Sequence, residues 1–293
     1  MNSALAEKGE TTRRKLRPQE FRTIRQMMYD SFGIDLDGKE VLVAARLGKK
    51  LRELSLASYE LYIEHVQQDA SGEYLTGMVD ALTTNHTSFF RELQHFDYLR
   101  HTVLPTLHPS GSIRIWSAAC STGEEPYSIA FTLIEELEAV SAARATVVAT
   151  DISSKVLAHA ERGIYPESRF GDIPVERLRR FVLKGSGESA GHYRIRKEIR
   201  SLITFHRLNL MEDFSHIGLF SVIFCRNVMI YFDRETQQNL VNRLADQLVP
   251  GGHLLIGHSE SLNGIEHPLR YVCPATYRKS SAGSNSPHGR RAS

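Results

Sequence analysis

The alternation of strand-like and helical segments after residue 112 constrains the fold of this chain more than any other feature. Short apolar runs typical of strands occur at 113–116, 146–150, 202–206, 220–225, 253–257 and 272–277. Helical periodicity occupies 126–138, 154–162 and 235–248, and Pro250-Gly251-Gly252 is predicted to close the last helix. Strands separated by helices pair in parallel, so we expect a mostly parallel sheet with helices on both faces.

The segment from 165 to about 200 interrupts this alternation. A short helix is predicted at 175–183 and an alternating strand at 192–196, with Gly185, Gly187 and Gly191 between them. Glycines at this density favour tight turns. We therefore predict a small β-rich insertion within the α/β domain.

Residues 18–82 have apolar positions at three- and four-residue intervals and no strand-like run. They predict a separate all-helical domain of three or four short helices. Residues 83–110 would connect it to an α/β domain that spans 111–280. The charged residues 1–17 and the polar residues 281–293 have the composition of loose tails.

The composition is that of an ordinary globular protein, with no strong bias toward binding nucleic acid. The 293 residues carry a net charge of +2 and are 41% hydrophobic, which suits one large domain or two smaller ones. No apolar run approaches the roughly 20 residues of a membrane span, and residues 1–17 lack the apolar core of a signal peptide. We expect a cytoplasmic protein that does not insert into membranes.

The cysteines and histidines form no metal-binding pattern. Cys120, Cys225 and Cys273 lie far apart without Cys-x-x-Cys spacing, as in proteins of a reducing cytoplasm. His95 and His101 would face different sides of one helix, unlike a helical metal-binding pair. The sequence therefore predicts no metal site and no disulfide framework.

Residues 113–128 comprise the first strand, a turn of small residues and the start of a helix. Ser121 and Gly123 would let a ligand approach the backbone at the carboxyl end of a strand, where open α/β sheets bind nucleotide-like cofactors. Glu124 and Glu125 follow directly, and carboxylates at a helix N-terminus would repel a pyrophosphate. The sulfonium and ammonium groups of S-adenosylmethionine fit better than NAD or ATP. Glu124 could also simply complement the helix dipole.

Polar side chains follow the other predicted strands. Asp151 ends the second strand, where a carboxylate accepts hydrogen bonds from ribose hydroxyls or caps the next helix, two roles that its position favours equally. Asn209 follows the third strand and Asn227 the fourth, and each amide offers a donor and an acceptor. Tyr231 lies beyond Asn227, either as a core aromatic or as a contact in the same pocket.

Three segments carry a resemblance to a known family. They read Thr-Thr-Asn-His-Thr-Ser-Phe-Phe-Arg-Glu at 83–92, Ser-Thr-Gly-Glu-Glu-Pro-Tyr-Ser at 121–128 and Phe-Cys-Arg-Asn-Val-Met-Ile-Tyr-Phe at 224–232. They are similar, in this order, to the signature segments of the chemotaxis receptor methyltransferases, the CheR family. The resemblance extends from about Pro18 to Tyr277. It implies a Rossmann-like class I methyltransferase domain with a small antiparallel β insertion, preceded by a small all-α domain.

The resemblance also implies an activity and residue roles. Glutamate side chains of methyl-accepting chemotaxis receptors would become methyl esters, with S-adenosylmethionine as cofactor and S-adenosylhomocysteine as product. Arg91 and Tyr231 would meet the substrate as the catalytic pair. Cofactor contacts would come from the segment before the sheet and from its strand ends, namely Asn85, Thr87, Arg91, Glu124, Asp151, Asn209, Leu210, Arg226 and Asn227.

The implied reaction needs no strong base. A glutamate side chain has a pKa of about 4.3, so near neutral pH its carboxylate oxygen attacks the sulfonium methyl group directly. The enzyme must align and partly desolvate this weak nucleophile. We expect Arg91 to hold the carboxylate and Tyr231 to fix its second oxygen, without removing a proton.

A basic stretch in the helical domain would hold the receptor. It contains Arg46, Lys49, Lys50 and Arg52. In an arbitrary protein these residues would form an ordinary solvated helix face. In this family they would attract glutamate-rich receptor helices, an effect that weakens with salt.

The glycine-spaced loop of the insertion gives a second docking hypothesis. Gly185, Gly187 and Gly191 resemble the loop of those family members that tether a receptor's C-terminal peptide. The peptide would add a strand to the edge of the small sheet. A plain hairpin turn explains these glycines nearly as well.

Two other functions remain as alternatives. A nucleic-acid methyltransferase would explain the basic helices, but the Asp/Asn-Pro-Pro-Tyr/Phe segment of amino-group methylases does not follow the fourth strand, and Cys273-Pro274 reverses a Pro-Cys nucleophile. A non-catalytic signalling adaptor would bind S-adenosylmethionine without transferring its methyl group. The presence of each implied catalytic residue weakens this alternative. The sequence favours the receptor methyltransferase and no nucleic-acid partner.

Overall fold

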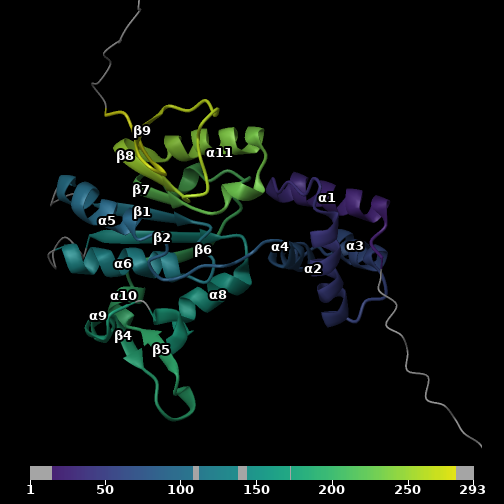
Figure 1. Cartoon of the computed structure of the whole chain (residues 1–293), viewed down its shortest axis with the longest axis horizontal. Coiled ribbons are helices and arrows are strands. Elements are labelled where there is room, and N and C mark those ends of the chain that lie inside the picture. Colours follow the sequence, from purple (N-terminus) through teal and green to yellow (C-terminus); the bar gives the residue numbers. More distant parts are fainter. Residues whose placement is uncertain (1–14, 108–111, 138–143, 172, 282–293) are drawn as a thin grey trace, which may run out of the picture. The chain divides into compact units, whose positions relative to one another are not determined.

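The structure is a computed structural model that describes residues 15–107, 112–137, 144–171 and 173–281 (Figure 1). The chain divides into two compact units, one of residues up to Ser31 with Asp35–Thr84 and one of Phe32–Ile34 with the residues from Asn85 onward. The predicted tails 1–17 and 281–293 lie almost wholly outside the described residues. None of the described helices is long and apolar enough to cross a membrane.

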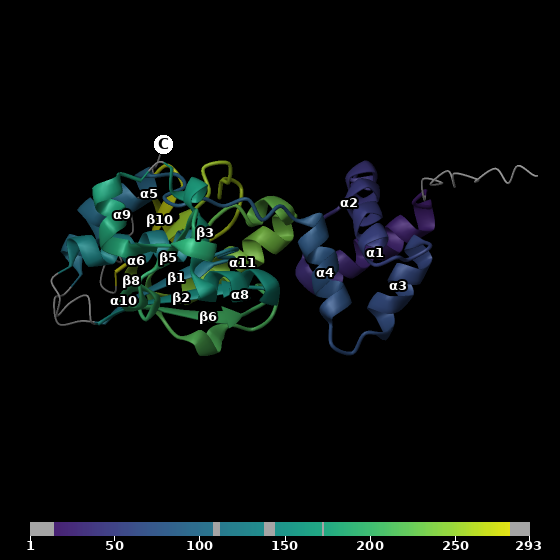
Figure 2. The same cartoon turned by 90° about the horizontal axis from the view of Figure 1, so that it is seen from below.

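The described part of the first unit is a bundle of four helices, drawn in purple and blue in Figure 2. They are α1 (Pro18–Phe32), α2 (Glu40–Glu53), α3 (Tyr59–Gln68) and α4 (Glu73–Leu82). Apolar residues at helical spacing, such as Ile24, Leu47 and Tyr62, are fully buried between them. The Ser58 side chain begins α3 by accepting a hydrogen bond from the backbone N–H of Leu61. The predicted all-helical domain is confirmed.

The second unit is built on a seven-stranded sheet in the order β6-β2-β1-β7-β8-β10-β9. Its strands are β1 (Ile113–Ala118), β2 (Ala145–Asp151), β6 (Ile203–Arg207), β7 (Phe220–Cys225), β8 (Leu248–Ile256), β9 (Leu269–Cys273) and β10 (Thr276–Lys279). The first five in this order pair in parallel, and β10 and β9 are antiparallel. Every residue of β7 is buried, so both faces of the sheet are covered. The predicted α/β architecture is confirmed.

Three longer helices of this unit are α6 (Glu124–Glu136), α8 (Ser154–Arg162) and α11 (Arg234–Asp246). The predicted helix end at Pro250-Gly251-Gly252 is wrong, because α11 ends at Asp246 and β8 passes through these residues. The pairing of β7 with β8 jumps from Phe220–Leu248 to Val222–His253, so residues 249–252 form an irregularity where proline is tolerated. The strand predicted at 272–277 is instead the end of β9, a turn at Pro274 and Ala275, and the start of β10, with Ala275 at a φ of 58°.

The insertion forms a separate three-stranded antiparallel sheet in the order β3-β5-β4, at the bottom of Figure 1. Its strands are β3 (Ile164–Pro166), β4 (Val182–Lys184) and β5 (His192–Ile195), and its helices are α9 (Val175–Phe181), α10 (Lys197–Arg200) and the 3-10 turn η3 (Glu167–Phe170). The helix predicted at 175–183 ends at Phe181, because Val182 and Leu183 pair with β5. The predicted β insertion is confirmed.

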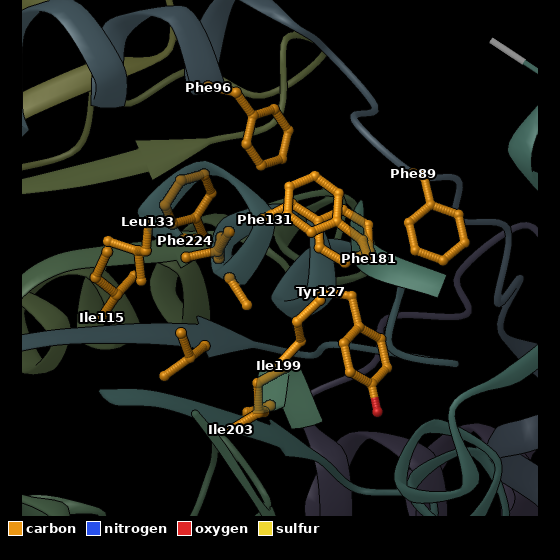
Figure 3. Close-up of a cluster of buried hydrophobic side chains, with 14 of the residues drawn as sticks. Phe89, Phe96, Ile115, Tyr127, Phe131, Leu133, Phe181, Ile199, Ile203 and Phe224 are labelled. Atoms are coloured by element: carbon orange, nitrogen blue, oxygen red, sulfur yellow. The ribbon is translucent and has the colours of Figure 1, made fainter. Parts of the chain in front are cut away.

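The segment predicted to connect the domains packs into the second unit. It contains α5 (Gln94–Tyr98), and Phe89, Phe96 and Leu99 belong to a buried hydrophobic cluster with β1 and α6. The rings of Phe89 and Phe170 stack with centroids 4.4 Å apart. Figure 3 shows Phe131 of α6 beside Phe181 of α9, whose centroids are also 4.4 Å apart. This cluster anchors the backbone before the sheet against α6 and the insertion.

Candidate functional site

The turn after β1 lies where the strand order of the sheet reverses, since β2 and β7 flank β1 on opposite sides. In open α/β sheets a ligand crevice forms at this position. Ala119, Ser121 and Gly123 have φ values of 59°, 50° and 96°. A Cβ added at Gly123 would lie 2.6 Å from the Cβ of Ala160. Packing against α8 therefore requires a glycine at position 123, whether or not a ligand approaches the backbone there.

Glu124, the first residue of α6, is fully buried. Its Oε2 accepts a hydrogen bond of 2.6 Å from the Thr122 hydroxyl, and its Oε1 pairs with the Arg169 guanidinium, whose Nε lies 3.1 Å away. Arg169 also donates to the Thr87 carbonyl at 3.0 Å. These bonds stabilise a charge that would otherwise be costly to bury. Arg169 comes from η3, so the insertion supplies a residue of this site that no sequence motif indicated.

Asp151 joins the turn after β1 to the start of α8. Its Oδ2 accepts a hydrogen bond of 2.8 Å from the Ser121 N–H, and its Oδ1 accepts one of 3.0 Å from the Ser153 N–H. The side-chain cap of α8 is the Ser153 hydroxyl, which accepts from the N–H of Val156. Asp151 thus holds the turn after β1 against the start of α8.

Arg226 follows β7 and is 5% exposed. Its guanidinium donates to Glu125 and to Glu92, each at 2.9 Å, and to the carbonyl of Arg91. Burial acts to raise the pKa of Glu92, but the Arg226 charge and hydrogen bond hold it below its ordinary value. Burial raises the pKa of Glu125 in spite of the same guanidinium. Arg226 thus ties the segment that carries Arg91 to α6, and its side chain points at these carboxylates.

The segment before α5 has a tightly defined backbone. The Arg91 guanidinium donates to the His86 carbonyl at 2.7 Å, and the residues on either side, Phe90 and Glu92, have φ values of 54° and 57°. Thr87 is buried and Asn85 is exposed, and the Asn85 carbonyl accepts a hydrogen bond of 3.4 Å from the Ser121 hydroxyl. The segment is therefore held over the turn after β1.

The remaining predicted cofactor residues follow β6 and β7 at the same edge of the sheet. Asn209 is half-buried, its Oδ1 accepting from the Met211 N–H at 3.0 Å, and Leu210 is buried. Asn227 and Tyr231 are half-buried, and Asn227 has a φ of 58°. Hydrogen bonds around the turn after β1 involve the other predicted site residues, which are Asn85, Thr87, Arg91, Glu124, Asp151 and Arg226.

The basic residues of α2 do not form one uniform exposed face. Arg46 donates to the Leu82 carbonyl and, at 2.8 Å, to the Thr84 hydroxyl at the end of α4. Lys50 is half-buried, and a Cβ added at Gly77 of α4 would lie 3.5 Å from its Nζ. Lys49 and Arg52 are exposed. These two are therefore the side chains of the set that could reach a partner.

The three glycines of the insertion lie in the connection between β4 and β5. Gly187 and Gly191 have φ values of 57° and 80°, and a Cβ added at Gly185 would lie 2.1 Å from the Ser189 carbonyl oxygen. The hairpin itself thus requires these glycines. In the sheet order β3-β5-β4, β4 is an outer strand, the position at which a peptide strand would add.

Glu92, His95 and His258 form a group of metal-ligating residue types in the described part of the chain, with ligand atoms within 4.8 Å of one another. The histidine that lies beside His95 is thus His258, 163 positions further along the chain, and not His101. Burial, with the Arg226 charge, lowers the pKa of His95 to about 3. Because Arg226 already pairs with Glu92, a cation would compete with the guanidinium for this carboxylate. We assign no metal to this group.

Comparison with known proteins decides the family. Residues 85–277 match the family model described as CheR methyltransferase, SAM binding domain, and residues 19–83 match CheR methyltransferase, all-alpha domain. The chain belongs to the CheR methyltransferase family. Similar curated proteins are Chemotaxis protein methyltransferase 2 of Pseudomonas aeruginosa (42% identity, covering 88% of this chain and 92% of the relative) and the Chemotaxis protein methyltransferase of Escherichia coli (40%, covering 87% and 89%). That of Borreliella burgdorferi is 38% identical, covering 87% and 92%.

This CheR methyltransferase thus uses S-adenosylmethionine as its cofactor. The residues at the turn after β1 fit that molecule. Asp151 ends β2, and its carboxylate is of the type that accepts hydrogen bonds from ribose hydroxyls. Glu124 begins α6, and its carboxylate is of the type that accepts from an ammonium, while in this structure its two oxygens bind Thr122 and Arg169.

Replacing Asp151 with Asn is expected to weaken the binding of S-adenosylhomocysteine about tenfold, because a hydrogen bond to a charged acceptor is worth about 1.5–3 kcal/mol. Asn keeps the size of the side chain but turns one acceptor oxygen into a donor. Titration calorimetry measures the Kd, and Asp246→Asn at the exposed end of α11 is the matched control. An unchanged Kd for Asp151→Asn would argue against the ribose contact.

Proposed function

We propose that this enzyme methylates glutamate side chains of methyl-accepting chemotaxis receptors and produces glutamate methyl esters. The names of its relatives, which are chemotaxis protein methyltransferases, support a substrate in chemotaxis. The observation that carries the proposal is the buried Arg226, which holds the Arg91 segment beside the turn that bears Glu124. The proposal places the enzyme in the cytoplasm, where its three free cysteines stay reduced.

The bound cofactor supplies an electrophilic methyl group. In this proposal Glu124 accepts from the ammonium of the cofactor and Asp151 from its ribose, and Asn209 with Leu210 lies at the adenine. The cofactor is closed in by the residues at the end of β7 and before α5, namely Asn85, Thr87, Arg91, Arg226 and Asn227. Arg169 neutralises Glu124 and holds the Thr87 segment, so it is a positioning residue for both.

The acceptor carboxylate needs alignment rather than deprotonation, since it is already ionised near neutral pH. Arg91 offers a fork of N–H donors that matches the two oxygens of a carboxylate. Tyr231 offers a hydroxyl donor for one of them. Arg91 lies in the ordered segment before α5, and Tyr231 lies in the ordered segment after β7. In this proposal both side chains are oriented before the substrate arrives, and this lowers the entropic part of the activation barrier.

The decisive test is the transfer of labelled methyl groups from S-adenosylmethionine to soluble fragments of the receptor's methylation region. Release of labelled methanol in base would identify a methyl ester. Label that resists base would indicate methylation of nitrogen, and label in added nucleic acid would favour a nucleic-acid methyltransferase. Cofactor binding without any transfer would favour an adaptor.

We further propose that Lys49 and Arg52 attract the glutamate-rich receptor helix. Reversing both charges, Lys49→Glu with Arg52→Glu, is expected to raise the KM for the receptor fragment severalfold at low salt and to leave kcat unchanged, because long-range attraction assists encounter. The difference should shrink at high salt, where exposed charges are screened. Arg22→Glu on the exposed face of α1 is the control. An unchanged KM at low salt would remove α2 from the docking surface.

The small sheet is proposed to hold the receptor's C-terminal peptide along β4. Calorimetry with peptides from receptor C-termini tests this proposal directly. Binding to the whole enzyme that is unaffected by S-adenosylhomocysteine would support a tether separate from the pocket. Failure of all such peptides to bind would leave the loop as a plain hairpin.

A further inference from the structure

The backbone after β7 is held in an unusual conformation. Asn227 has a φ of 58°, in the left-handed region, which asparagine tolerates better than most residues other than glycine. The next element is the 3-10 turn η6 (Met229–Tyr231). Such backbone conformations persist only where surrounding groups hold them, and they concentrate at functional sites. The segment 227–231 therefore needs an anchor.

Glu260, in the turn that follows β8, provides this anchor. Its Oε2 accepts hydrogen bonds from the backbone N–H groups of Gly257 and Asn227, at 2.6 and 3.0 Å. Its Oε1 accepts from the N–H of Met229 at 2.8 Å. Hydrogen bonds to an ionised acceptor are stronger than those between neutral groups. One carboxylate thus holds both ends of the bend between β7 and η6.

The fit around this carboxylate is close. A Cβ added at Gly257 would lie 2.5 Å from the side-chain nitrogen of Asn227 and 2.9 Å from Oε2 of Glu260. The turn after β8 and the bend after β7 therefore touch through backbone and carboxylate, with no room for a larger residue at 257. Since Oε2 of Glu260 accepts directly from the N–H of Asn227, a change in the Glu260 side chain alters a contact of Asn227 itself.

We propose that Glu260 is a positioning residue, whose carboxylate holds Asn227 and Tyr231 in the orientation that the methyl transfer requires. This inference rests on the proposed function, in which Asn227 lies at the cofactor and Tyr231 at the acceptor glutamate. Glu260 acts through these two residues and contacts neither the substrate nor the cofactor. Nothing in the sequence around Glu260 indicates the role, because its partners are backbone groups.

The variant Glu260→Gln tests the proposal because it preserves volume while it changes the hydrogen-bond pattern. An amide has one acceptor oxygen, and its NH2 group would face either the N–H of Met229 or those of Asn227 and Gly257. We expect kcat to fall about tenfold or more at saturating cofactor and receptor, with a change of less than about threefold in the KM for the receptor. Glu266→Gln, on the exposed part of the same turn region, is the matched control and should retain full activity.

Hydrogen exchange gives a readout that does not depend on turnover. In Glu260→Gln, the backbone amides of residues 226–232 should exchange faster, while those of β2 stay protected as in the unaltered enzyme. Glu260→Asp keeps the charge and should restore part of both the protection and kcat. Unchanged exchange at 226–232, or a kcat within about twofold of the unaltered enzyme, would overturn the proposal.

The two proposals fail in distinguishable ways. If the unaltered enzyme methylates no receptor fragment, the proposed function fails, whatever the exchange data show. If it methylates receptors and Glu260→Gln is as active as Glu266→Gln, only the positioning role of Glu260 fails. If Glu260→Gln loses the protection of β2 as well, the carboxylate stabilises the whole unit and the specific positioning role is likewise rejected.

Discussion

Replacing Arg226 with Met is expected to lower the free energy of unfolding of the second unit by about 3–5 kcal/mol, the cost of breaking a buried ion pair by removing one partner. The Arg226 side chain is 2% exposed, and its partners Glu92 and Glu125 are 14% and 13% exposed. Both carboxylates would lose their cation while remaining buried. Urea unfolding followed by the fluorescence of Trp116, the single tryptophan, which is buried in β1, measures the change.

The pH dependence of this loss has a defined sign. The pKa of Glu92 is lowered in the folded state, so its contribution to stability is present above the ordinary value of 4.5 and is lost as the pH falls through the lowered pKa. The deficit of Arg226→Met should therefore shrink in this acidic range. Lys184→Met, which removes the exposed partner of Glu167, is the control and should cost about 0–1 kcal/mol. If Arg226→Met lost as little stability as Lys184→Met, the stabilising role of the buried ion pairs of Arg226 with Glu92 and Glu125 would be contradicted.

The Tyr231→Phe variant is expected to lose activity about tenfold to a hundredfold in kcat, because a small misplacement of the acceptor carboxylate is costly to the reaction rate. The substitution removes only the hydroxyl proposed to hold the second carboxylate oxygen. The Kd of S-adenosylhomocysteine should be unchanged, since the aromatic ring remains. Steady-state methylation of a receptor fragment gives kcat, and calorimetry gives the Kd.

Tyr271→Phe on β9, whose side chain is 64% exposed, is the matched control for this variant. Full turnover by Tyr231→Phe would remove Tyr231 from the proposed catalytic pair. Weaker S-adenosylhomocysteine binding with normal kcat would assign the hydroxyl to the cofactor instead.

Local physical signals account for much of the correct fold prediction. The sequence predicts the strand at 220–225 and the helix at 154–162 with the bounds that β7 and α8 have in the structure. The strand is a continuous apolar run, and the helix is bounded by the Ser153 cap and by Gly163 in the left-handed conformation. Predictions failed where pairing between distant residues decides the conformation, as in β8, where Leu248 and His253 pair with β7 on either side of Pro250.

The sequence by itself determined the order of elements, the small-residue turn after the first strand, and the acidic residues Glu124 after that turn and Asp151 at the end of the second strand. These features follow from hydrophobic periodicity and from the chemistry of neighbouring residues, which are local in the chain. Only the tertiary structure decided which groups neutralise and orient them. Arg169 and Glu124 are 45 positions apart, Arg226 and Glu92 are 134 apart, and Glu260 and Asn227 are 33 apart. Hydrogen bonds and ion pairs at such separations leave no periodic pattern, because they form only when folding brings distant segments together.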